Sequence, residues 1–198
     1  MKKNVTEIFN LRPIGDMRQQ EDIYIKRIQN GETELFASLI ERYSEPVFLL
    51  IHRIISNRED AEELTQDVFL KIYRTLDTFK GESLFSTWLY RIAYNTAISA
   101  TRKKKQDFLY VEEQTIENIP DEEIEHYFEN EIDHSRLLAL DEALKRLSPE
   151  ERGIISLFYM EEKTIEEIAS VTGLTIANVK VKLHRLRKRL YGMLEEKR

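Results

Sequence analysis

The last quarter of this chain carries successive helix-start signals, and they restrict its possible folds more than any other feature. Ser148 precedes Pro149, and Glu151 follows three residues after the serine. This order places a hydroxyl at the N-cap, a proline at the first helical position and a carboxylate at the third, which is typical of a helix start. Thr164 and Glu167 repeat the capping signal. Two helices are therefore expected here, each opened by its own cap.

A third helix is expected to begin at Thr175. Apolar side chains recur there at helical spacing on one face: Ile176, Val179, Leu183, Leu186 and Leu190. Basic side chains, uninterrupted by any acidic residue, cover the other positions: Lys180, Lys182, Arg185, Arg187, Lys188 and Arg189. Gly173 lies between the second and third helices, where glycine can adopt the left-handed conformation that ends a helix. The pattern predicts a helix-turn-helix.

The basic helix after Thr175 is suited to DNA. An α-helix fits the width of the major groove, while lysine and arginine neutralise the flanking phosphates and release counterions. The same residues allow a plainer alternative, a helical hairpin with a solvated basic face, because charge runs usually form solvated surface. We interpret the segment as a DNA-binding helix-turn-helix and keep the hairpin as the alternative.

Composition favours an all-α protein. The chain has 198 residues, 41% of them hydrophobic, which is enough to build one domain or two small ones. Only 6 glycines and 4 prolines occur, and 33% of the residues are charged, which favours helices joined by short turns. The absence of cysteine excludes disulfides and cysteine-based zinc sites and is compatible with a reducing compartment.

Targeting signals and membrane spans are not indicated by the sequence. No apolar run approaches the roughly 20 residues that span a bilayer. Residues 1–22 lack the continuous apolar core of a signal peptide. A soluble, cytoplasmic protein without direct membrane insertion is therefore expected.

The net charge of -6 is distributed unevenly along the chain. Residues 107–133 contain eleven acidic residues and no lysine or arginine. Residues 83–106 carry five basic residues and no acidic one, and residues 174–191 carry six basic residues and no acidic one. The pattern indicates an acidic linker between two basic surfaces, each able to hold nucleic acid.

Upstream of the acidic linker the apolar spacing is again helical. The expected helices span residues 23–30, 34–55, 57–76 and 84–104. Gly31 should end the first of them, and Pro46 should bend or split the second. The expected architecture is therefore two small helical domains, joined by the acidic linker, with the helix-turn-helix in the second.

Aromatic and basic residues are interleaved at the end of the first domain. Five aromatic residues lie close together: Phe79, Phe85, Trp88, Tyr90 and Tyr94. Unpaired bases stack on such rings for about 1 to 3 kcal/mol each. Aromatic residues at helical spacing are more often part of a core, so that alternative stays open for each ring. The adjacent loop at residues 80–83 could line a pocket for a base turned out of the duplex.

The sequence does not predict an enzyme. Glu123 with His126 and Glu131 with His134 match the Glu-x-x-His pairs that supply ligands in di-iron bundles. Such a site needs the pairs on different helices, whereas these lie on one acidic stretch. No nucleophile pattern, phosphate-binding glycine loop or dinucleotide motif occurs. We expect no catalytic residue, metal, cofactor or small-molecule substrate.

Six motifs, three in each expected domain, follow one another along the chain. In the first domain these are residues 60–73 (DAEELTQDVFLKIY), 79–83 (FKGES) and 86–95 (STWLYRIAYN). In the second they are residues 147–152 (LSPEER), 165–169 (IEEIA) and 179–188 (VKVKLHRLRK). Together they closely resemble bacterial RNA polymerase sigma factors of the extracytoplasmic-function type. The resemblance runs from about Ile23 to Leu194, with independent motifs in the right order.

The resemblance implies a domain organisation and a polymerase-binding face. Residues 23–105 would form the region 2-like domain, 106–136 the linker toward the RNA exit path, and 137–198 the region 4-like domain, after an N-terminal extension at 1–22. One face of the helix expected at residues 57–76 would bind the clamp helices of core RNA polymerase: Asp60, Glu63, Gln66, Asp67 and Lys71.

The resemblance also implies two promoter contacts. The residues implied to open the minus-10 element and bind its extruded base are Phe79, Lys80, Gly81, Glu82, Ser83, Trp88, Tyr90, Asn95, Arg102, Lys103 and Lys104. Those implied to read the minus-35 element are Thr175, Asn178, Lys180, Lys182, His184, Arg185 and Lys188.

Since the acidic linker can fold back on both basic surfaces, the free chain is expected to bind promoter DNA poorly until polymerase separates its domains. Many relatives are also inhibited by an anti-sigma factor.

Two features of the chain depart from the resemblance. Residues 1–22 extend beyond the usual start of such factors, and Val181 stands where the family often has a small polar residue.

Two other functions are compatible with the sequence. A polymerase-independent helix-turn-helix regulator is the main alternative; it would usually dimerise and read a palindrome. A protein-binding helical adaptor is the third interpretation.

Overall fold

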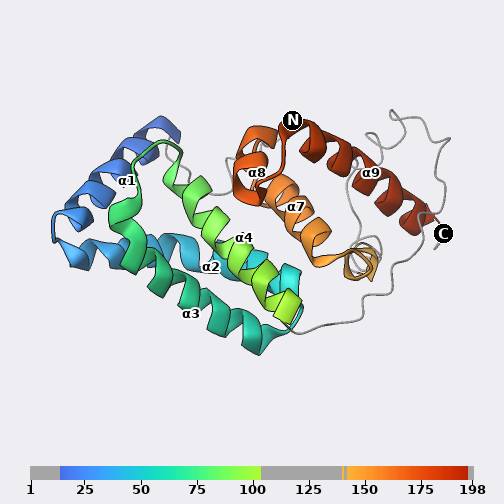
Figure 1. Ribbon diagram of the computed structural model, residues 1–198, viewed down its shortest axis with the longest axis horizontal. Coiled ribbons are helices and arrows are strands. Elements are labelled where there is room, and N and C mark those ends of the chain that lie inside the picture. Colours follow the sequence, from blue (N-terminus) through green and yellow to red (C-terminus); the bar gives the residue numbers. More distant parts are fainter. Residues whose placement is uncertain (1–13, 104–139, 141, 196–198) are drawn as a thin grey trace, which may run out of the picture.

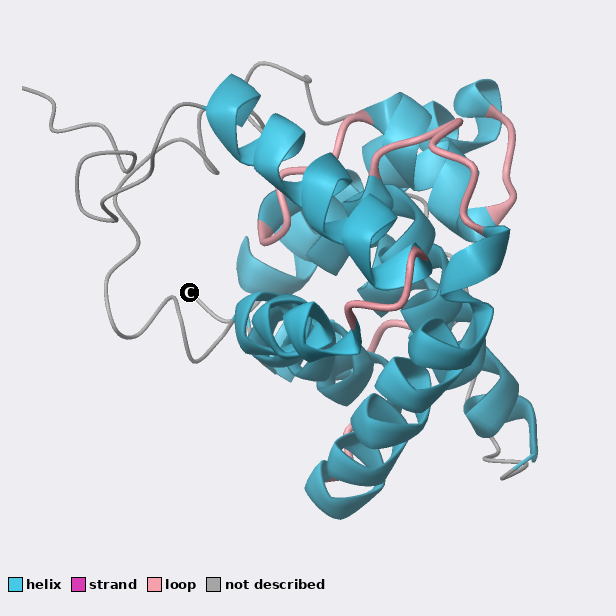
Figure 2. Ribbon diagram, turned by 90° about the vertical axis from the view of Figure 1, so that its left-hand side faces the viewer, coloured by secondary structure: helices cyan, strands magenta, loops and turns pink. Residues whose placement is uncertain are grey.

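The computed structural model describes residues 14–103, 140 and 142–195, and every regular element in these ranges is helical (Figure 1). Short turns join most of the helices (Figure 2). In chain order the elements are α1 (Ile14–Gln29), the 3-10 turn η2 (Thr33–Leu35), α2 (Phe36–Ile55), α3 (Arg58–Thr75), the 3-10 turn η3 (Leu76–Thr78), α4 (Phe85–Lys103), α7 (Pro149–Tyr159), α8 (Ile165–Thr172) and α9 (Ile176–Glu195). The expected all-α class is confirmed. The acidic linker and the Glu-x-x-His pairs lie outside the described residues.

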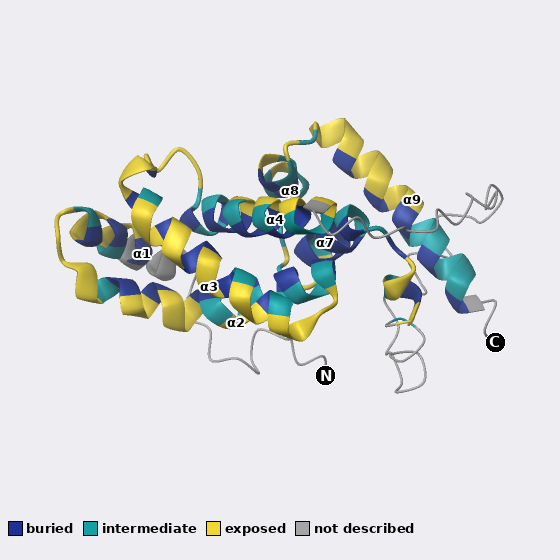
Figure 3. Cartoon of the chain, turned by 60° about the horizontal axis from the view of Figure 1, so that its bottom comes forward, coloured by how far each residue is buried: buried dark blue, intermediate teal, exposed yellow. Residues whose placement is uncertain are grey.

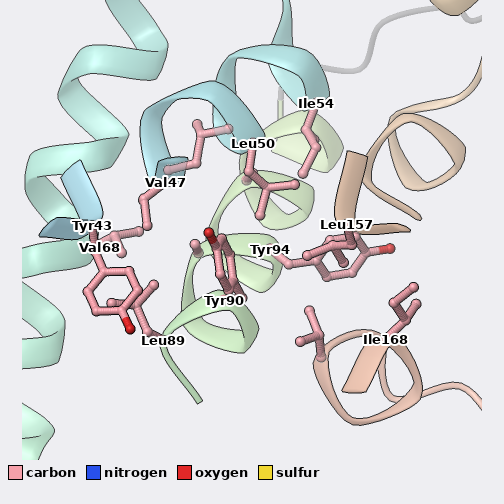
Figure 4. Packing of buried hydrophobic residues seen from close by; sticks show 14 of the residues in the cluster. Tyr43, Val47, Leu50, Ile54, Val68, Leu89, Tyr90, Tyr94, Leu157 and Ile168 are labelled. Atoms are coloured by element: carbon pink, nitrogen blue, oxygen red, sulfur yellow. The ribbon is translucent and has the colours of Figure 1, made fainter. Parts of the chain in front are cut away.

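Helices α1 to α4 form an N-terminal body built around α2. The buried stripe of α2 includes Val47, Leu50 and Ile54, each fully excluded from solvent. It packs against α3 and α4, which are themselves in contact. Figure 4 shows Val68 of α3 and Leu89 of α4 in the same apolar cluster. The helical spacing of apolar residues therefore places the core where the sequence predicted it.

Two helix bounds differ from the predictions. A bend or a split was predicted at Pro46; α2 runs through this residue as one element, so the split does not occur. Burial on both sides of the proline holds the helix together despite the missing N–H. Helix α1 starts at Ile14, earlier than residue 23, although its first turns have little apolar periodicity. Glu21 anchors it, because its buried carboxylate accepts a hydrogen bond from the Tyr43 hydroxyl at 2.5 Å.

Local capping fixes the start of α3. The Asn57 side chain accepts a hydrogen bond from the Asp60 amide at 2.8 Å. Ser56, just before it, adopts a left-handed conformation (φ 61°) that ends α2. The chain therefore reverses within a few residues, and this tight turn sets α3 along α2.

Helices α7, α8 and α9 belong to a C-terminal body with the predicted caps. Ser148 and Glu151 form a reciprocal capping box at α7, and Thr164 and Glu167 form another at α8. Gly173 ends α8 in the left-handed conformation (φ 75°). Helix α9 then follows after a short turn, which confirms the helix-turn-helix.

We expect Ser148→Ala to lower the free energy of unfolding by about 1 kcal/mol, because the α7 N-terminus loses its hydroxyl acceptor. Ser170→Ala is the matched control, since Ser170 is an exposed residue within α8. It should change stability by less than about 0.5 kcal/mol. Chemical denaturation followed by circular dichroism measures both, and equal shifts would contradict the capping role of Ser148.

The two bodies pack directly against each other (Figure 1). Helix α7 lies against α2, and α8 lies against α4. This contact was not predicted from the sequence, which indicated the acidic linker as the connection between the two domains. None of the helices in the described ranges is long and apolar enough to cross a membrane.

Candidate nucleic-acid and polymerase interfaces

Helix α9 divides into a buried stripe and an exposed polar surface. Val179, Leu183, Leu186 and Leu190 are buried against the rest of the C-terminal body. The predicted minus-35 residues lie on the other side: Thr175, Asn178, Lys180, Lys182, His184 and Arg185 are exposed, and Lys188 is half-buried. Figure 3 shows that the first half of α9 is the more exposed half. A DNA groove could therefore be reached by the N-terminal part of α9.

The hydroxyl of Thr175 caps α9, as it accepts a hydrogen bond from the Asn178 amide at 3.2 Å. This contact places both residues at the exposed end of the helix. The Thr175 side chain is therefore held at the N-terminal end of α9, the end at which a recognition helix contacts base edges.

Arg187 and Arg189, in the second half of α9, contact residues of the C-terminal body. The Arg187 Nε donates to the Tyr159 hydroxyl at 2.8 Å, and its guanidinium lies over the Phe158 ring, 5.2 Å from the centroid. Arg189 donates to the Glu151 carboxylate at 3.0 Å. These contacts hold α9 to α7, so Arg187 and Arg189 stabilise the C-terminal body.

The predicted polymerase-binding face lies along the outside of α3. Glu63, Gln66, Asp67 and Lys71 are exposed, and Asp60 is half-buried near the helix start. Two large apolar residues on the same helix were missed by the sequence analysis: Leu70 is 52% exposed and Tyr73 is 46% exposed. Their position outside the apolar stripe of α3 is the sequence signal that could have identified them as exposed. An acidic surface with exposed apolar residues is suited to protein binding.

Phe79 belongs to the core rather than to an open stacking surface. It is buried, and its ring centroid lies 5.4 Å from that of Trp88 and 5.7 Å from that of Phe85. The core alternative therefore holds for Phe79 and Phe85. The loop residues that follow, at 80–83, are exposed, and Gly81 has a positive φ of 74°.

A residue missed by the sequence analysis holds the start of this loop. The Gln29 side-chain amide, at the end of α1, donates to the carbonyl oxygens of Leu76 and Phe79 at 2.9 Å and 3.1 Å. A long-range contact of this kind leaves no local sequence signal. It fixes the loop relative to α1 and so positions the exposed residues 80–83.

The remaining predicted minus-10 residues are spread along α4. Trp88 is half-buried beside Phe79, whereas Tyr90 is only 3% exposed. Asn95 is exposed, and its side-chain amide donates to the Arg91 carbonyl at 2.8 Å. Arg102 is exposed near the end of the helix, while the Lys103 side chain and Lys104 lie outside the described residues. The structure thus brings Phe79 and Trp88 together but leaves Asn95 and Arg102 farther along α4.

The C-terminal body contacts α4 beside Trp88 through polar groups. The Tyr90 hydroxyl donates to the Glu161 carboxylate, and the Thr87 hydroxyl donates to the Glu167 carboxylate at 3.1 Å. Lys163 donates to the Ser86 hydroxyl at 3.2 Å. Burial raises the pKa of Glu161 above its usual range, and burial also raises the pKa of the Tyr90 hydroxyl. No role was predicted for Glu161 from the sequence.

A second contact joins α7 to α2 and α4. The buried Arg152 guanidinium donates to the Ile54 carbonyl at 2.8 Å and to the Ser56 hydroxyl, both at the C-terminal end of α2. Burial lowers the pKa of Arg152. A Cβ atom on Gly153 would lie 2.6 Å from Cε2 of Tyr94. Figure 4 shows Tyr94 beside Leu157. The two bodies therefore approach closely at this glycine.

Comparison with known proteins identifies the family. The Sigma-70 region 2 model matches residues 39–106, and the Sigma-70, region 4 model matches residues 137–190. The ECF RNA polymerase sigma-E factor of Escherichia coli K12 is 30% identical over 180 residues, which cover 84% of this chain and 90% of that protein. The chain belongs to the ECF sigma factors. The ECF RNA polymerase sigma factor SigW of Bacillus subtilis is 29% identical over 182 residues, covering 87% of this chain and 95% of that protein.

Solved structures share the fold of this sigma factor. CnrH, in complex with the cytosolic domain of CnrY, has a TM-score of 0.62 and 21% identity, covering 88% of this chain and 96% of that one. The sigma factor RpoE of Bartonella quintana, in complex with the anti-sigma factor NepR, has a TM-score of 0.61 and 23% identity, covering 82% and 98%. The α-helical architecture of the two bodies is therefore that of known sigma factors.

Membership of the family establishes the general function. A sigma factor is a non-catalytic subunit that binds core RNA polymerase and initiates transcription at specific promoters. The resemblance that was read from the motifs is confirmed. A polymerase-independent regulator is not supported, because such a regulator is not expected to contain the region 2 domain that this chain has.

Proposed function

We propose that this ECF sigma factor divides promoter recognition between its two bodies and binds polymerase through α3. The observation that carries the proposal is the separation on α9 of a buried apolar stripe from an exposed polar surface that has no acidic residue between positions 176 and 191. Because an exposed cationic helix fits the major groove, the C-terminal body reads the minus-35 element. The two domains given above, at residues 23–105 and 137–198, are part of this proposal, with the first extended back to Ile14 because α1 begins there.

The minus-35 element is read from the first half of α9. Lys180, Lys182 and Arg185 are exposed and can reach phosphates or guanine edges, while Asn178 can pair with adenine. Val181 is 48% exposed on the same part of the helix and offers an apolar contact, such as one to a thymine methyl group. The Arg187 and Arg189 contacts hold the helix in place for this reading.

The minus-10 element is bound by the loop at residues 80–83 together with α4. The loop is exposed and held by Gln29, and half-buried Trp88 lies next to it. An extruded base could stack on an aromatic ring there while the exposed loop surrounds it. Arg102 at the far end of α4 supplies a cation for the backbone.

Core polymerase binds the outer face of α3. The carboxylates of Glu63 and Asp67 provide charge for a basic partner surface, and Leu70 and Tyr73 provide apolar area at the same place. Charge steers association, whereas buried apolar and aromatic side chains usually supply most of the affinity.

An anti-sigma factor is proposed as a further partner, and the cytoplasm as the place of action. The support comes from the similar structure of the sigma factor RpoE, which is bound by the anti-sigma factor NepR. A partner of this kind would compete with polymerase or DNA for the exposed faces of the two bodies.

Run-off transcription with reconstituted holoenzyme over genomic fragments tests the proposal. We expect discrete transcripts from a small set of fragments, with promoter elements upstream of each start. Core polymerase without the sigma factor is the control. Equal transcript patterns with and without the protein would contradict the proposed function.

A variant with Glu63→Lys and Asp67→Lys is expected to bind core polymerase about tenfold more weakly, because two attractive charges on α3 become repulsive. The matched control carries Glu41→Lys and Glu45→Lys, two exposed positions four residues apart on α2. Fluorescence anisotropy of labelled protein titrated with core polymerase measures both. An equal loss in the control would show that net charge, and not the α3 face, determines the affinity.

A further inference from the structure

Three aromatic rings flank the exposed loop at residues 80–83. The ring centroids of Phe79, Phe85 and Trp88 lie 5.4 to 5.9 Å apart in every pair. We call these three rings the aromatic cluster. Phe79 and Phe85 are buried, whereas Trp88 is half-buried. The shape of any pocket that the loop forms therefore depends on how the aromatic cluster is held.

The end of α1 holds the aromatic cluster at Phe79. The Gln29 side-chain amide donates to the carbonyl oxygens of Leu76 and Phe79, so one side chain of α1 joins two backbone positions just before the loop. The Leu76 carbonyl also accepts a hydrogen bond from the Phe79 amide at 3.0 Å. Figure 1 shows α1 beside this connection between α3 and α4. Gln29 therefore fixes the backbone that carries the Phe79 ring.

The last turn of α1 is itself fixed. Gly31 has a positive φ of 104°, and its amide donates to the Ile28 carbonyl at 3.0 Å. The Glu32 amide donates to the Arg27 carbonyl at 3.0 Å, and the two side chains form an ion pair. This is the pattern of a Schellman motif, which satisfies the carbonyl groups at a helix end. Gln29 therefore extends from a well-defined backbone.

A second contact reaches the aromatic cluster from the middle of α1. The buried Glu21 carboxylate accepts a hydrogen bond from the Tyr43 hydroxyl of α2, and it also pairs with Arg42 at 3.4 Å. The Tyr43 ring packs edge-on against Phe85, with 5.8 Å between the centroids. Glu21 belongs to residues 1–22, for which no role was predicted from the sequence. Part of this extension thus supports the aromatic cluster.

We propose that α1 is a positioning element for minus-10 recognition, in which Gln29 and Glu21 hold the aromatic cluster in the arrangement that receives an extruded base. The inference rests on the proposed function of the loop at residues 80–83 and deepens it. Both residues act through Phe79 and Tyr43 rather than by contact with DNA. Side chains that are fixed before binding spend less free energy on ordering when the ligand arrives. Loss of either contact then weakens capture of the base and leaves the backbone contacts unchanged.

Two variants remove these contacts without changing the charge of the chain. Gln29→Met keeps the length of the side chain but has no donor for the two carbonyl groups. Tyr43→Phe keeps the ring against Phe85 but has no hydroxyl for Glu21. The matched controls are Asn30→Ala, which removes an exposed amide beside Gln29, and Ser38→Ala, which removes an exposed hydroxyl of α2. Circular dichroism verifies that each variant is folded.

Affinity of reconstituted holoenzyme for a single-stranded minus-10 oligonucleotide is the first measurement. The oligonucleotide is the non-template strand of a promoter mapped by run-off transcription, and a series of copies carries one abasic position each. With unaltered holoenzyme, the abasic position that weakens binding most marks the extruded base. Gln29→Met and Tyr43→Phe should each bind the intact strand about fivefold more weakly, because a lost hydrogen bond has about this effect. Both should bind the marked abasic strand as unaltered holoenzyme does.

The comparison of intact and abasic strands separates positioning from general stability. Equal weakening on both strands would overturn the inference, because loss of structure or of polymerase binding affects both alike. Unchanged binding to both strands would also overturn it, and the two controls should show unchanged binding. A scan in which no abasic position weakens unaltered holoenzyme is a different result, because it contradicts the proposed capture of a base and the inference with it.

Fluorescence of Trp88 in the free chain is the second measurement. Trp88 is the only tryptophan in the sequence, so its emission reports on the aromatic cluster. Gln29→Met should shift the emission to longer wavelength and increase its quenching by acrylamide, because Phe79 is no longer held against Trp88. Asn30→Ala should change neither property. Unchanged emission and quenching in Gln29→Met would overturn the inference, since the aromatic cluster would then keep its arrangement without α1.

Discussion

A variant carrying Lys182→Ala and Arg185→Ala is expected to reduce transcription from mapped promoters about a hundredfold in reconstituted holoenzyme. Both side chains are exposed on α9 and contribute nothing to the buried stripe of the helix. Each contact to a base edge or phosphate is worth about 1 to 3 kcal/mol, so the loss of two gives a factor of this size. Run-off transcription at subsaturating holoenzyme measures the effect.

The control for this variant removes two cations elsewhere. Lys26→Ala with Lys145→Ala gives the same change in net charge at exposed positions outside α9. It should retain nearly full activity. Salt dependence separates phosphate contacts from base contacts, because each lost phosphate contact lowers the slope of log affinity against log salt by about one. Equal activity of the α9 variant and the control would remove the minus-35 role from α9.

Local charge, rather than net charge, explains how an acidic chain binds DNA. The protein has a formal net charge of -6, yet the first half of α9 exposes Lys180, Lys182 and Arg185 and contains no acidic residue. Arg187 and Arg189, in the second half, are held by Tyr159 and Glu151. A single basic helix is thus divided between an exposed surface, which we propose to contact DNA, and residues that attach the helix to the body.

Helix starts and the helix-turn-helix could be predicted because their signals are local. A capping box involves residues three positions apart, and Gly173 needs only its own backbone to turn. Tertiary contacts overrode the local signals at two places. Packing carries α2 through Pro46, and the hydrogen bond between Tyr43 and Glu21 helps to fix α1, which begins before its predicted start.

The candidate site could be predicted only in part. Exposure of the polar residues on α3 and α9 follows from helical periodicity, and the structure places them as expected. The burial of Tyr90 does not follow from it, because its partner Glu161 is 71 residues away along the chain. Pairing at such a separation depends on how the two bodies pack, which no local pattern encodes.

Two leucines in the N-terminal body have different roles in spite of similar helical settings. Leu89 of α4 is fully buried, whereas Leu70 of α3 is 52% exposed. Leu89→Ala is expected to lower the free energy of unfolding by about 3 kcal/mol, because it removes buried apolar contacts and leaves a cavity. Leu70→Ala should lower it by less than about 0.5 kcal/mol. Urea denaturation measures both variants.

Polymerase affinity should show the opposite order for this pair. Under conditions where both variants are folded, Leu70→Ala should weaken binding to core polymerase, since apolar area at the centre of an interface supplies affinity. Leu89→Ala should leave that affinity unchanged, because its side chain cannot reach the surface. If both variants lose stability and affinity in parallel, α3 contributes to polymerase binding only by keeping the fold intact, and the proposed apolar contact at Leu70 is wrong.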